Sequence, residues 1–169
     1  DAVVEVVGGV EQAGAWVRRA LTQGASVVTA NKMLLAAHAP ELLHLAATNG
    51  AQLRFEAAVA GGVPLIHGVR EGLAGDRLMR VAGILNGTSN YILSRMTREG
   101  HGFQEVLAEA QRAGYAEADP TFDVAGIDSA HKLSIMVSLA YGTPVNVKEI
   151  YTEGITKITP LDIAYAKEF

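Results

Sequence analysis

Hydrophobic and polar residues follow two different periods in the first third of the chain. Short valine-rich runs at Ala2–Val7 and Ser26–Thr29, and a third run at Leu53–Val59, predict strands. Between these runs, apolar residues recur every three to four positions and predict helices over Ala13–Leu21 and Met33–Thr48. Strands that alternate with helices of this length are typical of a βαβ arrangement, with a parallel sheet covered on both faces.

After Gly61-Gly62 the pattern becomes mostly helical, and neither an internal repeat nor a linker interrupts it. Any domain boundary is therefore expected near Ala60–Pro64. The expected helices lie at Pro64–Leu73, directly after Asn86–Asn90, at Phe103–Ala113 with Gly114 as its C-cap, at Ile127–Tyr141 and from about Pro160–Asp162. The expected strands are Arg77–Leu85 and Lys148–Thr152, and the expected polar loop is Tyr115–Gly126.

The composition is that of an ordinary globular protein and excludes several classes. The 169 residues are 49% hydrophobic and 19% charged, with a net charge of −4 and no block of like charge, so we expect neither disorder nor a nucleic-acid partner. No apolar run reaches the roughly 20 residues that cross a bilayer. The absence of cysteine excludes a disulfide framework, a thiolate zinc site and a cysteine nucleophile. A cytoplasmic location fits these features.

The segment Val28–Lys32 joins the end of an expected strand to the start of an expected helix. In an open parallel sheet, ligands bind beyond the carboxyl ends of the strands, so Lys32 is placed to face an anionic or carbonyl group. The alternative is a solvated lysine in the first turn of a helix. Gly8-Gly9 follows the first strand and is a weak sign by itself, because the chain contains no Gly-x-Gly-x-x-Gly motif.

Glu56 lies among apolar neighbours in an expected strand, where an unpaired carboxylate is costly. It should therefore have a partner, which is either a basic side chain or a hard cation. Oxygen-ligand cation sites commonly join one carboxylate to main-chain carbonyls, and the following segment Val59–Val63 can bend to offer them. Spacing alone leaves a salt-bridged structural Glu56 and a cation ligand as equal alternatives.

Acidic residues gather before the last long helix of the predicted pattern. Glu117, Asp119 and Asp123 precede it, while Asp128 and Lys132, four positions apart, share one of its faces. One interpretation is a solvated acidic loop with a single surface ion pair. The other is that several carboxylates hold an ammonium ligand while the lysine acts on another group.

Taken in order, the motifs resemble those of homoserine dehydrogenases. The matching segments cover essentially the whole chain; they are EVVGG, VVTANKMLLA, FEAAVAGGVPLI, GILNGTSNYIL, GYAEADPTFDVAGIDSAHKL and EGI. The most specific feature is GYAEADP followed by G-x-D-x-A-x-K-L. The resemblance implies an α/β fold: the C-terminal part of a Rossmann-like nucleotide-binding domain at residues 1–60, then an α+β substrate-binding, catalytic and oligomerisation domain at residues 61–169.

The resemblance also implies an activity, the NAD(P)-dependent interconversion of L-homoserine and L-aspartate 4-semialdehyde on the route to threonine, methionine and isoleucine. It makes Lys132 the catalytic proton donor. The implied substrate-binding residues are Glu117, Asp123, Asp128 and Thr88. The implied contacts to the cofactor, NADP or NAD, are Lys32, Gly114 and Gly8. An implied sodium ion takes Glu56 and the main-chain oxygens of Val59, Gly61 and Val63.

The chain also departs from the family pattern. Complete members have a first strand with a Gly-rich phosphate turn, and a C-terminal segment that returns to the nucleotide domain, and neither occurs in this sequence. We therefore expect both domains to be truncated, and the piece alone to be nearly inactive. The expected partners are a small-molecule substrate and further copies of the chain, without nucleic acid or membrane. The alternatives are a non-catalytic fragment that keeps the fold, which the intact acid–lysine set disfavours, and the dehydrogenase part of a bifunctional aspartate kinase–homoserine dehydrogenase.

Overall fold

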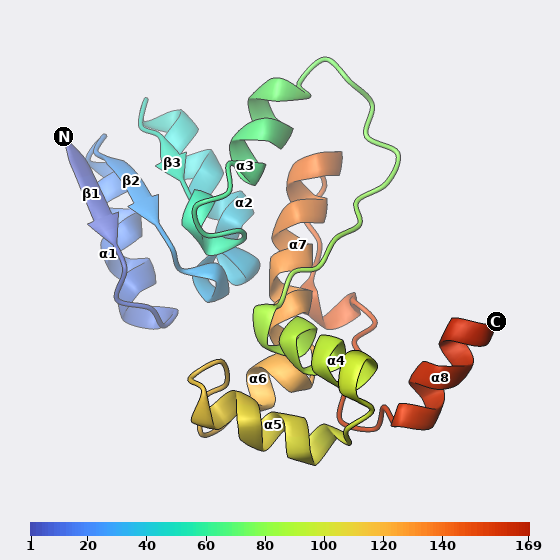
Figure 1. Ribbon diagram of the computed structural model, residues 1–169. Coiled ribbons are helices and arrows are strands. Elements are labelled where there is room, and N and C mark those ends of the chain that lie inside the picture. The colour runs from blue at the N-terminus through green and yellow to red at the C-terminus, as the bar shows by residue number, and fades with distance from the viewer. The chain divides into compact units, whose positions relative to one another are not determined.

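The computed structural model describes residues 1–169 as two compact units (Figure 1). The first comprises Asp1–Ala82 and His131–Ile150, and the second comprises Gly83–Ala130 and Tyr151–Phe169. The elements in chain order are β1 (Ala2–Glu5), α1 (Glu11–Thr22), β2 (Ser26–Thr29), α2 (Lys32–Thr48), β3 (Leu53–Arg54), η1 (Glu56–Ala58), α3 (Leu65–His67), η2 (Gly68–Gly72), α4 (Gly87–Glu99), α5 (Phe103–Arg112), α6 (Thr121–Val124), α7 (Ile127–Tyr141), η3 (Val147–Glu149) and α8 (Pro160–Glu168). The predicted α/β class is confirmed.

The sheet of the first unit has three parallel strands in the order β1–β2–β3. Val3 pairs with Val27, and Val27 pairs in turn with Leu53, so these side chains share one face. Helices α1 and α2 cover this face (Figure 1), on which Val27 and Leu53 are buried. The opposite face carries Val4 and Val28, which are 68% and 44% exposed, so the prediction of a sheet covered on both faces is wrong for this chain.

The core of the first unit lies between the sheet and these two helices. Leu21 of α1 and Leu34 and Leu42 of α2 are fully buried, and each such leucine stabilises the fold by about 1.5–3 kcal/mol. Ile135 and Met136, from the part of α7 that belongs to this unit, join the same cluster. The apolar spacing therefore predicted both α1 and α2 correctly.

The third strand is shorter than the predicted range Leu53–Val59. It ends at Arg54, and the 3₁₀ helix η1 follows. Phe55, Ala58 and Val59 are the buried residues of this segment, and their spacing of three and four is helical rather than alternating. The strand predicted through Val59 is therefore wrong beyond Arg54.

Two further predicted strands are absent. Residues Arg77–Leu85 form no regular element, and Met79 and Ile84 within this segment are each 77% exposed. Lys148–Thr152 instead overlaps the 3₁₀ helix η3. A strand needs a hydrogen-bonding partner, and the sheet of this chain joins β1, β2 and β3 alone. In contrast, Pro64–Leu73 is helical as predicted, because α3 continues directly into the π-helical turn η2.

The second unit is helical and has its own apolar core. Ile92 and Met96 of α4 pack with Val106 of α5, and all three are essentially inaccessible to solvent. Helix α8 begins at Pro160, as predicted, where the side chain of Thr159 caps its first turn. None of the helices in the chain combines the length and hydrophobicity that a membrane crossing requires.

Candidate active site

The connection after β1 is held by the last residue of that strand, Glu5, which is only 3% exposed. Its Oε1 accepts hydrogen bonds from the main-chain N–H groups of Val7 at 2.8 Å and Gly8 at 3.0 Å, and its Oε2 accepts one from the Thr29 hydroxyl at 2.6 Å. Burial raises the pKa of Glu5, but these hydrogen bonds outweigh burial and hold it below its ordinary value. The sequence analysis missed this residue, although a glutamate inside a run of valines was a usable signal.

The connection after β2 leads directly into α2. Asn31 caps this helix, because its side-chain oxygen accepts a hydrogen bond from the N–H of Leu34 at 3.1 Å. The side-chain amide of Asn31 also donates to the main-chain oxygen of Gly9 at 2.6 Å. Lys32 is the first residue of α2 and is partly buried. Gly8 and Lys32 thus follow the carboxyl ends of neighbouring parallel strands.

Glu56 has partners of a kind that neither sequence interpretation named. Its Oε1 accepts a hydrogen bond from the N–H of Ile66 at 2.6 Å, and its Oε2 accepts one from the N–H of His67 at 2.9 Å. The carboxylate therefore satisfies main-chain donors in the short helix α3. The carbonyl of Val63 accepts a hydrogen bond from Leu65 at 2.8 Å. Carboxylate and carbonyl oxygens have further lone pairs, so the donor chemistry still fits a hard cation.

In the second unit, Asn86 brings together two of the predicted substrate-binding residues. Its side-chain nitrogen donates to Asp123 Oδ1 at 2.7 Å and to Asp128 Oδ2 at 3.0 Å. Its side-chain oxygen accepts from the N–H of Ser89 at 2.7 Å, which makes Asn86 the N-cap of α4. Asn86 is 7% exposed and Asp128 1%, so little water reaches this arrangement. The sequence predicted this helix directly after Asn86–Asn90, so it placed the start of α4 too late, and it missed the bridge between the two acids.

Thr88 and Gly114 lie on either side of a contact between α4 and the end of α5. The Thr88 hydroxyl donates a hydrogen bond at 3.0 Å to the main-chain oxygen of Tyr115, whose ring stacks on that of Tyr91 with centroids 4.6 Å apart. Gly114 has a φ of +77°, the left-handed conformation that ends many helices. Glu117 is exposed and lies further along the same loop.

Asp128 and Lys132 both belong to α7 and are separated by about one helical turn. Asp128 is buried within the second unit, and Lys132 is partly buried within the first. The main chain just before α7 lies in close contact with the segment that contains Gly154. A Cβ added at Gly154 would lie 2.6 Å from the carbonyl oxygen of Val124, closer than any side chain tolerates. Glycine at this position therefore lets the segment containing Gly154 pack directly on the turn that leads to Asp128.

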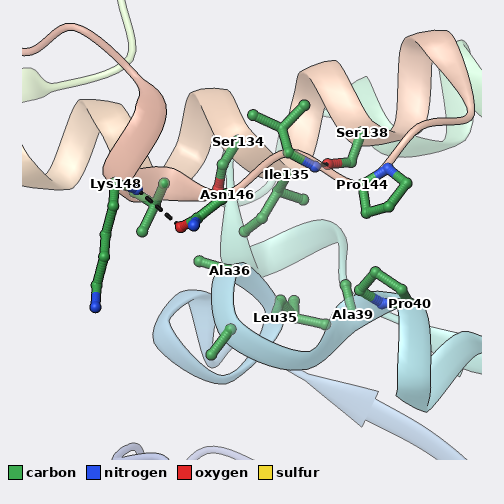
Figure 2. A pocket seen from close by; sticks show the side chains of 13 residues that line it. Leu35, Ala36, Ala39, Pro40, Ser134, Ile135, Ser138, Pro144, Asn146 and Lys148 are labelled. Atoms are coloured by element: carbon green, nitrogen blue, oxygen red, sulfur yellow. Dashed lines mark hydrogen bonds between the residues drawn. The ribbon is translucent and has the colours of Figure 1, made fainter.

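A cavity of about 460 Å³ lies in the first unit, bordered by α2, by the part of α7 that belongs to this unit and by the segment after α7 (Figure 2). Figure 2 shows Leu35 and Pro40 on one wall and Ile135 on the other. The Ser138 hydroxyl accepts a hydrogen bond from the N–H of Val145 at 2.9 Å. None of the predicted site residues lines this cavity, so the predicted chemistry does not use it.

One group of side chains in the second unit has the donor types of a metal site. The ligand atoms of His101, Glu105 and Glu109 lie within 4.8 Å of one another. The Arg95 guanidinium, however, forms ion pairs at 3.0 Å with both Glu99 and Glu109. Because this guanidinium already places a positive charge beside the carboxylates, we interpret the group as an ion-pair network rather than a metal centre.

Comparison with protein families gives two matches. Residues 64–169 match the family model described as homoserine dehydrogenase. Residues 1–56 match the model described as homoserine dehydrogenase, NAD binding domain. The two matches together cover nearly all of the chain.

Individual proteins are similar over almost the same extent. A homoserine dehydrogenase of Pseudomonas aeruginosa is 54% identical over 166 residues, or 98% of this chain. The crystal structure of a homoserine dehydrogenase from Thiobacillus denitrificans has a TM-score of 0.95 and 52% identity over 99% of this chain. A hyperthermophilic archaeal homoserine dehydrogenase mutant in complex with NADPH has a TM-score of 0.88 and 34% identity over 96%. The chain spans 38%, 39% and 49% of the lengths of these three proteins.

Proposed function

Because the chain belongs to the homoserine dehydrogenase family, we propose that the protein catalyses the NAD(P)-dependent interconversion of L-homoserine and L-aspartate 4-semialdehyde. The observation that carries this proposal is the amide nitrogen of Asn86, which binds both Asp123 and Asp128, the latter one helical turn before Lys132. Acidic groups and a lysine are what a substrate with an ammonium group and a reacting carbonyl requires.

Lys132 is the proposed proton donor. When bound, the nicotinamide supplies or accepts the hydride. In the reductive direction negative charge grows on the aldehyde oxygen, and the Lys132 ammonium stabilises that charge and then transfers a proton to the oxygen. In the oxidative direction the neutral amine removes the hydroxyl proton. The buried residues Ile135 and Met136 anchor the same part of α7 in the core, which supports a fixed position for the lysine.

Asp123 and Asp128 are the proposed partners of the substrate ammonium group. Two carboxylates that share the neutral amide of Asn86 repel one another, and a cation bound beside both lowers that repulsion. We propose Glu117 as a further acidic partner from the adjoining loop. Thr88 is proposed to line the same pocket, where its hydroxyl is oriented by the bond to the carbonyl that follows Gly114.

Gly8 and Lys32 are the proposed contacts to NADP or NAD in the first unit. Apart from Gly8 itself and its two neighbours along the chain, no atom lies within 4 Å of the position that a Cβ would take at Gly8, so a dinucleotide can approach the main chain closely. Lys32 adds a positive charge to the first turn of the 17-residue helix α2, whose N-terminal end already favours anions. This chemistry fits an anionic dinucleotide. Gly114 is the proposed contact in the second unit.

The sodium ion remains a separate proposal. Glu56 and the main-chain oxygens of Val59, Gly61 and Val63 would hold it, and an all-oxygen donor set supports the assignment. We also propose that residues 1–60 belong to the nucleotide-binding domain and residues 61–169 to the substrate domain. The family matches over 1–56 and 64–169 support that division. The proposed setting is a homo-oligomer in the cytoplasm.

The test uses the full-length protein that contains this chain. We expect it to reduce NADP⁺ or NAD⁺ when L-homoserine is added, measured by absorbance of the reduced nicotinamide. 4-Hydroxybutyrate, which has the reacting hydroxyl but no ammonium group, should be a poor substrate because it cannot pair with the carboxylates. The 169-residue chain by itself should show little or no turnover. A full-length protein that oxidises no L-homoserine with either dinucleotide would contradict the proposal.

A further inference from the structure

Glu5 is a buried acid that the proposed reaction does not use. It stands at the end of a strand in a run of valines, with 3% of its surface exposed. An ionised carboxylate in such a place is costly unless several donors surround it. The hydrogen bonds of Glu5 therefore indicate which parts of the main chain this carboxylate holds in place.

One oxygen of Glu5 shapes the glycine turn. Oε1 accepts hydrogen bonds from the consecutive N–H groups of Val7 and Gly8, at 2.8 and 3.0 Å. Gly8 and Gly9 both have left-handed φ angles, +82° and +77°, which favour glycine. Glycines allow a turn to adopt many conformations, and the hydrogen bonds to Glu5 stabilise one of them.

The other oxygen reaches the next βα connection. Oε2 accepts from the Thr29 hydroxyl at 2.6 Å, and the Thr29 oxygen accepts from the N–H of Asn31 at 3.0 Å. Asn31 returns to the first connection by donating to the carbonyl of Gly9 at 2.6 Å. Glu5, Thr29, Asn31 and the turn at Gly8–Gly9 therefore form a closed ring of hydrogen bonds, and hydrogen bonds to a buried charge are among the strongest in proteins.

We propose that Glu5 is a positioning residue for the dinucleotide site: through this ring it holds Gly8 and the start of α2, with Lys32, in the mutual geometry that the nicotinamide dinucleotide requires. The inference rests on the proposed function. Both connections follow the carboxyl ends of neighbouring strands, the edge at which open parallel sheets bind ligands. Glu5 acts through the turn and through Thr29, without touching the dinucleotide itself.

The test compares two substitutions of Thr29 in the full-length protein. Thr29→Val keeps the shape and removes the hydroxyl that links Glu5 to Asn31, whereas Thr29→Ser keeps the hydroxyl. We expect Thr29→Val to raise the Kd for NADPH or NADH and the KM for the dinucleotide about tenfold, because small displacements of positioning groups have large effects. The KM for L-homoserine should change less than about twofold, and Thr29→Ser should restore dinucleotide binding.

Glu5→Gln provides a second variant, and combining it with Thr29→Val should add little, because both changes break the same ring. The matched controls are Glu11→Gln and Thr22→Val, two exposed positions on α1 that should leave dinucleotide binding unchanged. Kd is measured by nicotinamide fluorescence without substrate, below the unfolding temperature of every variant.

Two results would overturn the inference. One is a Thr29→Val protein whose Kd for the dinucleotide stays within about twofold of the unmodified protein. The other is an equal loss of dinucleotide and L-homoserine binding, which indicates a general structural role. An unmodified protein that binds the dinucleotide but oxidises no L-homoserine would contradict the proposed function and leave this inference standing. An unmodified protein that binds neither NADPH nor NADH would overturn both the proposed function and this inference.

Discussion

Two hydrogen-bonded carboxylate arrangements, one in each unit, are built in opposite ways. In the first unit the single carboxylate of Glu5 accepts three hydrogen bonds, two from main-chain N–H groups and one from Thr29. In the second unit the single amide nitrogen of Asn86 donates to two carboxylates, those of Asp123 and Asp128.

The two arrangements suit different proposed roles, main-chain positioning for the first and ligand binding for the second. Glu5 has several donors for one charge, so the pKa of Glu5 stays low and its carboxylate holds neighbouring main chain in place. Asp123 and Asp128 share the neutral amide of Asn86, and we propose that this pair of acids takes a cationic ligand. Burial of an acid is therefore by itself a poor guide to its role. Four predictions test this contrast.

The largest expected effect tests the role proposed for Lys132, which lies outside both arrangements. Lys132→Ala in the full-length protein should lower kcat about 10²- to 10⁴-fold, because the growing charge loses its proton donor. Dinucleotide affinity should hardly change, since the first arrangement stays intact. Steady-state kinetics and nicotinamide fluorescence measure the two effects. Lys148→Ala, an exposed lysine in the same unit as Lys132, is the control and should keep full turnover. Near-normal turnover in Lys132→Ala would remove the role given to this lysine.

A second prediction isolates the amide that joins the two acids. Asn86→Ser keeps a helix cap but removes the bridge, so the KM for L-homoserine should rise about tenfold as the carboxylates lose their common donor. Asn86→Asp also keeps the cap but adds a third negative charge, and should in addition lower the unfolding temperature. KM and thermal unfolding are measured on the same preparations. If both variants bind L-homoserine normally, Asn86 only caps α4.

The third prediction concerns the main-chain packing beside the second arrangement. Gly154→Ala should lower the free energy of unfolding by about 1–3 kcal/mol, because its Cβ would collide with the carbonyl of Val124 at 2.6 Å. Gly83→Ala in the same unit is the matched control, since a Cβ there meets no atom within 4 Å. Urea denaturation compares the two variants. If the two variants have equal free energies of unfolding, the turn before α7 can shift to accommodate the added Cβ.

The smallest expected effect contrasts Glu5 with an exposed acid. Because the pKa of Glu5 is lower in the folded than in the unfolded protein, its ionisation stabilises the fold above the ordinary glutamate pKa. That stabilisation disappears as the pH falls through the folded-state pKa. Glu5→Gln should therefore make the acid-side decline of the unfolding temperature shallower, which thermal scans at a series of pH values detect.

Glu41→Gln supplies the comparison for that experiment. The Arg18 guanidinium holds the pKa of Glu41 below its ordinary value, but half of this side chain is exposed and solvent screens the pair. Its loss should change stability by less than about 1 kcal/mol and leave the acid-side slope nearly unchanged. An equal effect of Glu5→Gln and Glu41→Gln would show that burial adds nothing to the role of Glu5.

The sequence predicted much of the fold where the signal is local. The apolar period of α1 and α2, the β-branched run of β2 and the whole of α7 were correct, and the family resemblance drawn from the motifs is confirmed. The first strand was also correct in its start, but β1 ends at Glu5 rather than at Val7. The strands expected at Arg77–Leu85 and Lys148–Thr152 were wrong, because a strand depends on a partner that a local pattern does not specify. The roles assigned to Lys132, Glu117 and the cofactor contacts remain predictions.

The sequence by itself determined the elements, the family and the residue types available for chemistry, since these depend on neighbours along the chain. Only the tertiary structure decided which side chains meet. Asn86 reaches Asp123 and Asp128 across 37 and 42 positions, and Glu5 reaches Thr29 across 24. Such contacts form when separate elements pack together and bring distant parts of the chain side by side. The local pattern of apolar and polar residues does not specify which elements pack together. For this reason the sequence predicted a helix near Asn86 but missed the bridge that Asn86 makes, and it gave no role to Glu5.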